Sequence, residues 1–247
     1  MGYRTDAATE FLNTTTQPIT DEPLSLAAWF NSESATLQQF ILGVITSGTF
    51  NHSWWIEANG GLAGDPVRAG SRATASALSA TGTGYTTGTW HHAAGTFASN
   101  TNRLAYIDGA AGTANTTNQA ITAGDQVRVA LAGDATLRFA GAIAEPAVWN
   151  VELTAAEIAV LARGYSPLFV RPQALVFYAP LVRKILDYKG RAITENGTTE
   201  IVAHVPKIIY PSKKVIGVPV AAAAGGRIFK LAGSGGGLGG VSRGLAA

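Results

Sequence analysis

The chain has 247 residues, of which 47% are hydrophobic and only 14% are charged, and it contains no cysteine. A chain of this length can bury a sizeable core, whereas the missing thiols exclude disulfide bonds and thiolate metal sites. The net charge of +2 hides an asymmetry: residues 1–165 hold 7 Lys and Arg against 13 Asp and Glu, and residues 166–247 hold 11 against 3. The first part of the chain is therefore acidic and the second part basic, so we expect the two parts to lie in different electrostatic surroundings.

Targeting and membrane signals are missing from the sequence pattern. Residues 1–20 lack the basic start and apolar run of a secretory signal. No stretch reaches about 18 consecutive apolar residues, so we expect no membrane-spanning helix. If the protein acts outside a cell, we expect it to arrive there by a route that needs no signal peptide.

Short apolar runs, separated by clusters of Gly, Asn, Asp, Ser and Thr, predict a series of β-strands. Several of these runs alternate between apolar and polar residues. Regularly spaced short strands with polar turns are typical of a sandwich, so we predict an all-β, antiparallel jelly roll over residues 1–182. The main runs lie at residues 23–31, 39–47, 53–59, 89–97, 103–109, 126–133, 139–150 and 174–181.

One short helix is expected near the end of this region. Thr154 and Glu157 have the spacing of a capping box, in which each side chain satisfies a backbone N–H at the helix start. Apolar residues follow at helical spacing, and Gly164 is a natural left-handed stop. The pattern predicts a helix over about residues 155–163.

The composition changes beyond residue 182. Turn signals at 187–190 and at Asn196-Gly197 predict a small β-hairpin over residues 183–203. Residues 204–247 combine prolines, a glycine-rich end and no acidic residue, which predicts an extended assembly arm with little folding drive of its own. We expect isolated apolar residues to anchor this arm to a partner: Ile208, Ile209, Tyr210, Phe229 and Leu231.

Four segments, in this order, resemble the laminin-G-like, concanavalin A-like jelly-roll domains. They are W-H-H-A-A-G-T-F (90–97), R-L-A-Y-I-D-G (103–109), F-A-G-A-I-A-E-P-A-V-W-N (139–150) and L-T-A-A-E-I (153–158). With P-L-S-L-A-A-W-F at 23–30, the match covers roughly residues 5–182. The resemblance implies a sandwich fold. Because the superfamily also includes glycoside hydrolases and members that bind calcium at the rim of the sandwich, the resemblance makes both functions candidates.

The adjacent His91 and His92 invite a metal or catalytic interpretation. Neighbouring strand residues point to opposite faces, so His92 should share a face with Trp90, and His91 should share the other with Phe97. Two histidines on opposite faces do not easily bind one metal ion. We therefore interpret them as structural residues of a strand covered on both sides, with Trp90 in the core. Trp149 is expected to be a core anchor near the helix.

The carboxylates do not form a hydrolase pattern. Retaining glycosidases need two carboxylates about 5 Å apart, and the E-x-D-x-x-E signature is absent. Glu57 is alone on its strand, whereas Asp21/Glu22 and Glu152/Glu157 fall in a loop and at a helix start. We predict that the protein is not an enzyme.

Calcium binding at the rim of the sandwich is an alternative to the expectation that the protein has no cofactor. Asp65, Asp108, Asp125 and Asp134 lie in turn-like contexts, with Asn59 near the first. Because Asp favours such positions for the turn itself, each residue has a sufficient structural explanation. We expect no cofactor, with one calcium ion at the rim as the open alternative.

Exposed aromatic rings are the candidates for glycan binding. Trp54, Trp55 and Tyr85 are the candidate rings for stacking on sugars. One of the adjacent Trp54 and Trp55 should be buried and the other more exposed. The competing interpretation is that all three pack in the core or between subunits.

A jelly roll joined to a basic, Gly/Pro-rich arm resembles the laminin-G-like structural proteins of tailed bacteriophages. We predict a non-enzymatic virion protein, such as a capsid decoration, head or tail accessory protein. It would be a homo-oligomer whose arm docks on neighbouring virion proteins. The alternative is a carbohydrate-binding adhesin on the virion or a cell surface. Six Lys and Arg over residues 201–247 are a thin density for an arm that tracks phosphates, so we do not expect nucleic acid as a partner.

Overall fold

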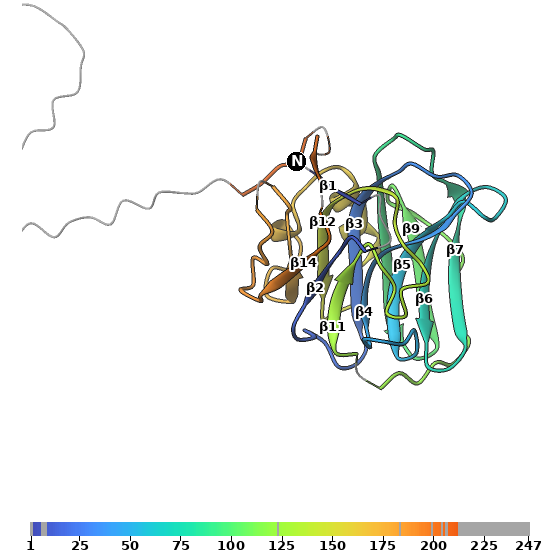
Figure 1. Ribbon diagram of the computed structural model, residues 1–247. Coiled ribbons are helices and arrows are strands. Elements are labelled where there is room, and N and C mark those ends of the chain that lie inside the picture. Colours follow the sequence, from blue (N-terminus) through green and yellow to red (C-terminus); the bar gives the residue numbers. More distant parts are fainter. Residues whose placement is uncertain are drawn as a thin grey trace, which may run out of the picture. The chain divides into compact units, whose positions relative to one another are not determined.

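The computed structural model describes residues 2–5, 9–122, 124–182, 184–198, 200–203, 205 and 207–211. Two antiparallel sheets lie face to face within one compact unit that extends to Pro211 (Figure 1). This arrangement confirms the predicted antiparallel sandwich. Phe229 and Leu231, two of the expected arm anchors, lie outside the described residues.

The first sheet, sheet A, has the strand order β10-β9-β8-β3-β12-β1-β15, and β13 also pairs with β12. Its strand β12 pairs with β3 along most of its length, with β1 at one end and with β13 at the other. The bounds are β1 (Gly2–Thr5), β3 (Leu24–Ser32), β8 (His91–Ser99), β9 (Asn102–Ile107), β10 (Ala110–Ala111), β12 (Gly141–Trp149), β13 (Leu175–Tyr178) and β15 (Glu200–Val202).

The second sheet, sheet B, has the order β14-β2-β11-β4-β5-β6-β7. Between the inner faces of the two sheets lies the main core, which includes Phe30, Trp54, Phe97 and Phe139. The bounds are β2 (Phe11–Thr14), β4 (Gln38–Ile45), β5 (Ser53–Asn59), β6 (Pro66–Arg72), β7 (Ser76–Gly84), β11 (Gln126–Val129) and β14 (Ile193–Asn196).

All eight predicted strand runs contain a strand, with ends shifted by up to four residues. Strands β6 and β7 were not predicted, because they consist largely of small residues with little apolar alternation. Gly70 in β6 shows why such residues occur there. A Cβ at this position would lie 2.3 Å from the ring of Trp55, so the indole packs directly on the backbone of the neighbouring strand.

The outer face of sheet A is covered by α1 (Ala155–Ala162) and by the 3-10 helix η1 (Pro167–Phe169). Buried Trp149 and Leu161 belong to the apolar cluster on this face, so Trp149 is the core anchor that was predicted. Strand β8 therefore has apolar cover on both faces, as expected. Among the helices in the described ranges, none has the length and hydropathy that a bilayer crossing requires.

The predicted hairpin over residues 183–203 is not formed. Strand β14 pairs with β2 in sheet B, whereas β15 pairs with β1 in sheet A. The consecutive strands β1 and β2 are already divided between the two sheets, and each offers an edge that a C-terminal strand fills. The turn at Asn196-Gly197 thus follows a strand of sheet B and precedes a strand of sheet A, and both β14 and β15 are part of the sandwich.

Candidate functional site

The three aromatic rings predicted to stack on sugars are buried. Trp54, Trp55 and Tyr85 are 0%, 1% and 3% exposed. Trp54 faces the core between the sheets and donates its indole N–H to Glu22 Oε1 over 2.6 Å. Trp55 faces the opposite side and donates to Glu57 Oε2 over 2.7 Å. No ring face is free for a sugar, so the prediction of glycan stacking at these three residues is corrected.

Two other tryptophans, Trp29 and Trp90, are only partly buried. Trp29 lies in β3 opposite His92 of β8, with its ring 5.4 Å from the imidazole in an edge contact. Trp90 immediately precedes β8, and its ring lies against Gly2 of β1, where an added Cβ would come within 2.9 Å. The prediction that Trp90 belongs to the core is therefore wrong, because its ring is only partly buried. It lies over the end of sheet A, on the face that α1 covers.

These two rings border an open groove of about 500 Å³, here called the Trp29–Trp90 groove. A second hollow of about 400 Å³, the Arg4 groove, shares Trp90 and Gly88 with it. The first is lined by Trp29, Gly88, Thr89, Trp90, Ala162, Arg163, Gly164, Val205 and Lys207. The second is lined by Arg4, Asn31, Glu33, Gly88, Trp90, Ala142, Val202 and Ala203.

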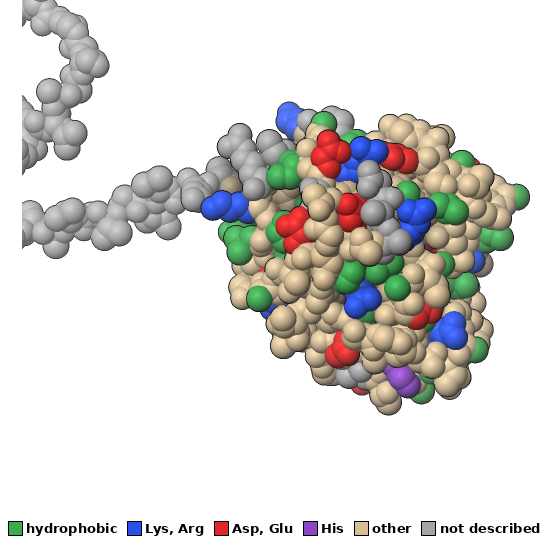
Figure 2. All heavy atoms as spheres, in the orientation of Figure 1, with side chains coloured by type: hydrophobic (Ala, Val, Ile, Leu, Met, Phe, Trp, Pro, Cys, Tyr) green, Lys and Arg blue, Asp and Glu red, His purple; other side chains and the backbone are tan. Residues whose placement is uncertain are grey.

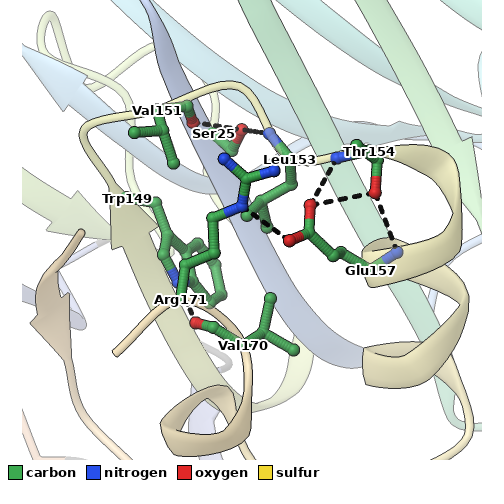
Figure 3. Close-up of polar contacts among 8 residues, drawn as sticks. All are labelled: Ser25, Trp149, Val151, Leu153, Thr154, Glu157, Val170 and Arg171. Atoms are coloured by element: carbon green, nitrogen blue, oxygen red, sulfur yellow. Dashed lines mark hydrogen bonds and ion pairs between the residues drawn. The ribbon is translucent and has the colours of Figure 1, made fainter. Parts of the chain in front are cut away.

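Helix α1 supplies one wall of the Trp29–Trp90 groove, and its first turn is held firmly (Figure 3). The predicted capping box is present: Thr154 N–H donates to Glu157 Oε2 over 2.8 Å, and Glu157 N–H donates to Thr154 Oγ1. Arg171 Nε donates to Glu157 Oε1 over 2.6 Å. At the other end, Gly164 has φ +87°, as the stop signal predicted, and Arg163 is the C-cap.

The segments on either side of α1 are also tied to this region. Buried Trp149 donates its indole N–H to Val170 O over 2.8 Å, and Ser25 links β3 to Val151 and Leu153 (Figure 3). These bonds attach the residues on both sides of α1 to sheet A. The helix C-terminus, with Arg163, is thereby fixed at the edge of the groove.

A buried polar cluster lies beneath the groove. A β-bulge in β12 places Glu145, which has φ +56°, on the face that α1 covers. Tyr178 and Tyr210 donate their hydroxyls to its two carboxylate oxygens over 2.5 and 2.6 Å. Burial, followed by the negative charge of Glu145, raises the pKa of both phenols, so they remain protonated donors. The carboxylate is thus satisfied by hydroxyl donors, one of which comes from the segment after β15.

His92 contacts the same small internal hollow as Glu145 and Trp29. The imidazole is 2% exposed, and burial lowers its pKa to about 4. His92 is therefore neutral at pH 7. Its Nδ1 is buried without a hydrogen-bond partner among the described residues.

His91 and His92 point to opposite faces of β8, as predicted. His91 Nδ1 lies 2.7 Å from Asp108 Oδ2, and the backbone N–H of Thr86 donates to His91 Nε2. The imidazole therefore accepts at Nε2 and donates from Nδ1 to Asp108. Although partial burial raises it, the hydrogen bonds from both histidines hold the pKa of Asp108 below its ordinary value. The ring joins the loop before β8 to the turn after β9.

The carboxylates considered for hydrolysis do not face one another across a shared substrate site. Glu57 accepts hydrogen bonds from Gln38 and Trp55 and forms an ion pair with Arg68 on the outer face of sheet B. Glu145 lies on the outer face of sheet A. Asp21 and Glu22 stay in a loop, Glu22 accepts from Trp54, and Glu157 caps α1 while Glu152 is exposed.

The turn aspartates are distributed over separate turns. Asp125 accepts from Ser47 N–H, Asp134 from Thr136, and Asn59 from Gly61 N–H, while Asp65 has φ +46°. Asp134 and Asn59 therefore accept within their own turns, as expected, whereas Asp125 links its turn to Ser47 after β4. Within the described part of the chain, no three His, Asp or Glu side chains gather as a metal site would require.

The expected arm anchors at residues 208–210 lie against the sandwich. Tyr165 and Ile209 form a parallel β-bridge, in which Ile209 N–H donates to Gly164 O and Ser166 N–H donates to Ile209 O. Ile208 is partly buried, whereas Ile209 and Tyr210 are 37% and 41% exposed. The start of the predicted arm is therefore attached to the α1 end of the sandwich. On the side that Figure 2 shows, hydrophobic side chains form only separate patches among uncharged groups.

Comparison with known proteins agrees with this architecture. The sequence model of a family described as the concanavalin A-like lectin/glucanases superfamily matches residues 6–159. No curated protein sequence matches the chain.

Three solved structures illustrate the shared fold. A native heptameric SAP-like pentraxin from Limulus polyphemus is 12% identical, with a TM-score of 0.57 over 78% of this chain and 88% of that chain. The CBM40 of the Ruminococcus gnavus IT-sialidase, bound to α2,3-sialyllactose, is 13% identical, with a TM-score of 0.51 over 65% and 95%. The enzymatically active domain of tailspike protein 2 from bacteriophage CBA120 is 12% identical, with a TM-score of 0.52 over 71% and 29%. At these identities the likeness concerns the fold alone.

Proposed function

Because the chain belongs to the concanavalin A-like lectin/glucanase superfamily, we propose that it is a non-catalytic carbohydrate-binding module with its ligand in the Trp29–Trp90 groove. The observation that carries this proposal is the pair of partly exposed indoles on one open groove. Ligand sites combine apolar walls with a few polar groups, and an indole face suits the apolar face of a sugar ring. Arg163, Lys207 and Thr89 supply the polar groups here.

The absence of catalysis is part of the proposal. Hydrolysis with retention or inversion needs two carboxylates across one scissile bond. Glu57 and Glu145 lie in different sheets and face away from each other. We expect the purified protein to release no reducing ends from a panel of polysaccharides. Turnover that disappears in Glu57→Gln or Glu145→Gln would contradict a purely binding role.

Sugar binding is tested on a glycan array, followed by calorimetric titration of the strongest glycan. Trp29→Ala and Trp90→Ala should each weaken binding by about tenfold or more, because each removes one apolar wall of the groove. Tyr188→Ala is the matched control, since Tyr188 is 61% exposed and lines neither groove. Unchanged affinity in both tryptophan variants would refute the site.

A second proposal, that this module is a virion accessory protein docked by its C-terminal arm, is favoured by the attachment of residues 207–211. The bridge to Tyr165 and the bond from Tyr210 to Glu145 give the arm a fixed starting point on the sandwich, with Ile209 and Tyr210 still partly exposed. The same fold occurs in a bacteriophage tailspike domain. We propose neighbouring virion proteins as partners and the virion as the location.

Because residues 207–211 are attached to the sandwich, the informative truncation removes residues 212–247. Removing 212–247 leaves the bonds of Ile209 and Tyr210 intact, so we expect a folded sandwich with unchanged sugar affinity. On phage particles, cross-linking mass spectrometry of the full chain should report links between the arm and a neighbouring subunit. Particles that incorporate the truncated protein at full occupancy would exclude the arm as the attachment device.

A further inference from the structure

Of the described residues, two cations and no acidic residue line the Trp29–Trp90 groove. Arg163 comes from the C-terminal end of α1, whereas Lys207 comes from the segment after β15. The chain therefore brings two positive side chains from separate elements to one hollow, beside two partly exposed indoles.

The two cations differ from the other basic residues on this face. Arg4 forms ion pairs with Glu33 and Glu200, and Arg171 forms one with Glu157. By contrast, the side chains of Arg163 and Lys207 make no hydrogen bond or ion pair with the described residues. A cation at a helix C-terminus also interacts favourably with the helix dipole, which explains Arg163 in part. It does not explain Lys207, which belongs to no helix.

The Arg4 groove on the other side of Trp90 has a different character. Its cation is already balanced by Glu33 and Glu200, and Asn31 offers an amide that both donates and accepts. Such a lining suits the hydroxyl groups of an uncharged sugar. Because Trp90 borders both grooves, one ligand that extends past this ring would meet the cationic groove first and the balanced groove second.

We propose that the Trp29–Trp90 groove selects an anionic sugar unit, carboxylated or sulfated, through Arg163 and Lys207, and that a neutral unit of the same glycan occupies the Arg4 groove. This inference rests on the proposed sugar binding. The guanidinium of Arg163 offers paired N–H donors that match two oxygens of a carboxylate or sulfate, and Lys207 adds a point charge. Binding should weaken with salt, because these charges are exposed.

The test uses the full chain on an array of matched triplets: a glycan with a neutral hexose, its hexuronic acid counterpart and its sulfated counterpart. Wild-type protein should bind the anionic members at least about tenfold more tightly than the neutral one. Arg163→Gln and Lys207→Gln should each weaken binding of the anionic members by a larger factor than binding of the neutral member, so that most of this preference is lost. Lys189→Gln, which changes an exposed lysine outside both grooves, should bind as wild type does.

Equal binding of neutral and anionic members, or a preference that survives both substitutions, would overturn the charge inference. The proposed sugar site would still stand in that case, provided that Trp90→Ala abolishes binding. Failure of wild-type protein to bind any member would overturn both. Should Arg163→Gln not fold, as judged by its thermal melt, Arg163→Lys and Lys207→Gln decide the question, because Arg163→Lys keeps the charge and loses the paired donors.

Discussion

The two pairs of tryptophans in this sandwich have opposite relations to solvent. Trp54 and Trp55 are neighbours in β5, in the interior of sheet B, and both are buried, one on each face of the strand. Trp29 and Trp90 are far apart in the sequence, yet they line the same groove near one end of sheet A and remain partly exposed. The adjacent Trp54 and Trp55 thus indicate a central strand that is covered on both faces. Trp29 and Trp90, by contrast, come from separate segments and are brought to one groove only in the folded protein.

The outer cover of each sheet explains this difference. Over Trp55, an apolar cluster that includes Phe40, Phe50, Ala132 and the partly buried Leu137 closes the outer face of sheet B. Over sheet A, α1 covers the region around Trp149 but ends at Ala162, where the groove begins. The accessible site is therefore the part of sheet A that the helix leaves open.

The largest expected effect on stability belongs to the buried pair. Trp54→Ala and Trp55→Ala should each lower the free energy of unfolding by about 3–5 kcal/mol, because each leaves a large cavity and takes an indole N–H donor away from a carboxylate. Urea titration followed by circular dichroism measures the loss. A change below about 1 kcal/mol in either variant would contradict the burial described for that ring.

The neutral imidazole beneath the groove should make the protein sensitive to acid. The pKa of His92 falls from 6.5 to about 4 on folding, so the unfolded chain takes up a proton first as the pH decreases. This residue should therefore remove about 3 kcal/mol from the free energy of unfolding between pH 6.5 and pH 4. The comparison of wild type with His92→Gln at both pH values isolates the effect. Parallel losses in the two proteins would show that His92 does not titrate as described.

Replacing a tryptophan of the accessible pair, Trp29 and Trp90, should destabilise the protein less than replacing one of the buried pair, Trp54 and Trp55. Trp90→Ala should lower the free energy of unfolding by about 1–2 kcal/mol, since part of the ring is already in water and only the buried remainder is lost. The same urea titration applies, with Trp54→Ala as the reference. A loss equal to that of Trp54→Ala would mean that Trp90 is a core residue after all.

The smallest expected effect concerns the helix that borders the groove. Thr154→Ala removes one half of the capping box and should cost about 1 kcal/mol. Because α1 stays folded against buried Ile158 and Leu161, we expect Arg163 to keep its place and the affinity for sugar to be unchanged. Thermal melts and calorimetric titration of this variant check both statements. Complete loss of binding would show that the groove depends on the first turn.

Much of the fold was predictable from local patterns. The capping box at Thr154, the left-handed stop at Gly164 and the opposite orientation of His91 and His92 each follow from a few neighbouring residues. The hairpin over residues 183–203 was predicted incorrectly, because the edges that receive β14 and β15 belong to strands β2 and β1, within the first 14 residues. No local signal marks such long-range pairing.

The site was less predictable for the same reason. Trp54 and Trp55 stand out in the sequence as a pair, but their strand lies inside a covered sheet. Trp29, Trp90, Arg163 and Lys207 come from four separated segments, and only the packed structure brings them to one groove. Only the two tryptophans of that group lay in segments that the sequence analysis singled out: Trp29 in P-L-S-L-A-A-W-F, and Trp90 in the W-H-H segment, where it was interpreted as core.

The most direct test of the tryptophan site follows the five indole N–H signals of the chain by two-dimensional ¹⁵N NMR during titration with the strongest anionic glycan from the array. Each signal is assigned by a Trp→Phe substitution at positions 29, 54, 55, 90 and 149. The account predicts that the signals of Trp29 and Trp90 move with the ligand concentration, while those of Trp54, Trp55 and Trp149 stay in place. Shifts confined to Trp54 and Trp55, or five unmoved signals with a glycan that binds by calorimetry, would contradict it.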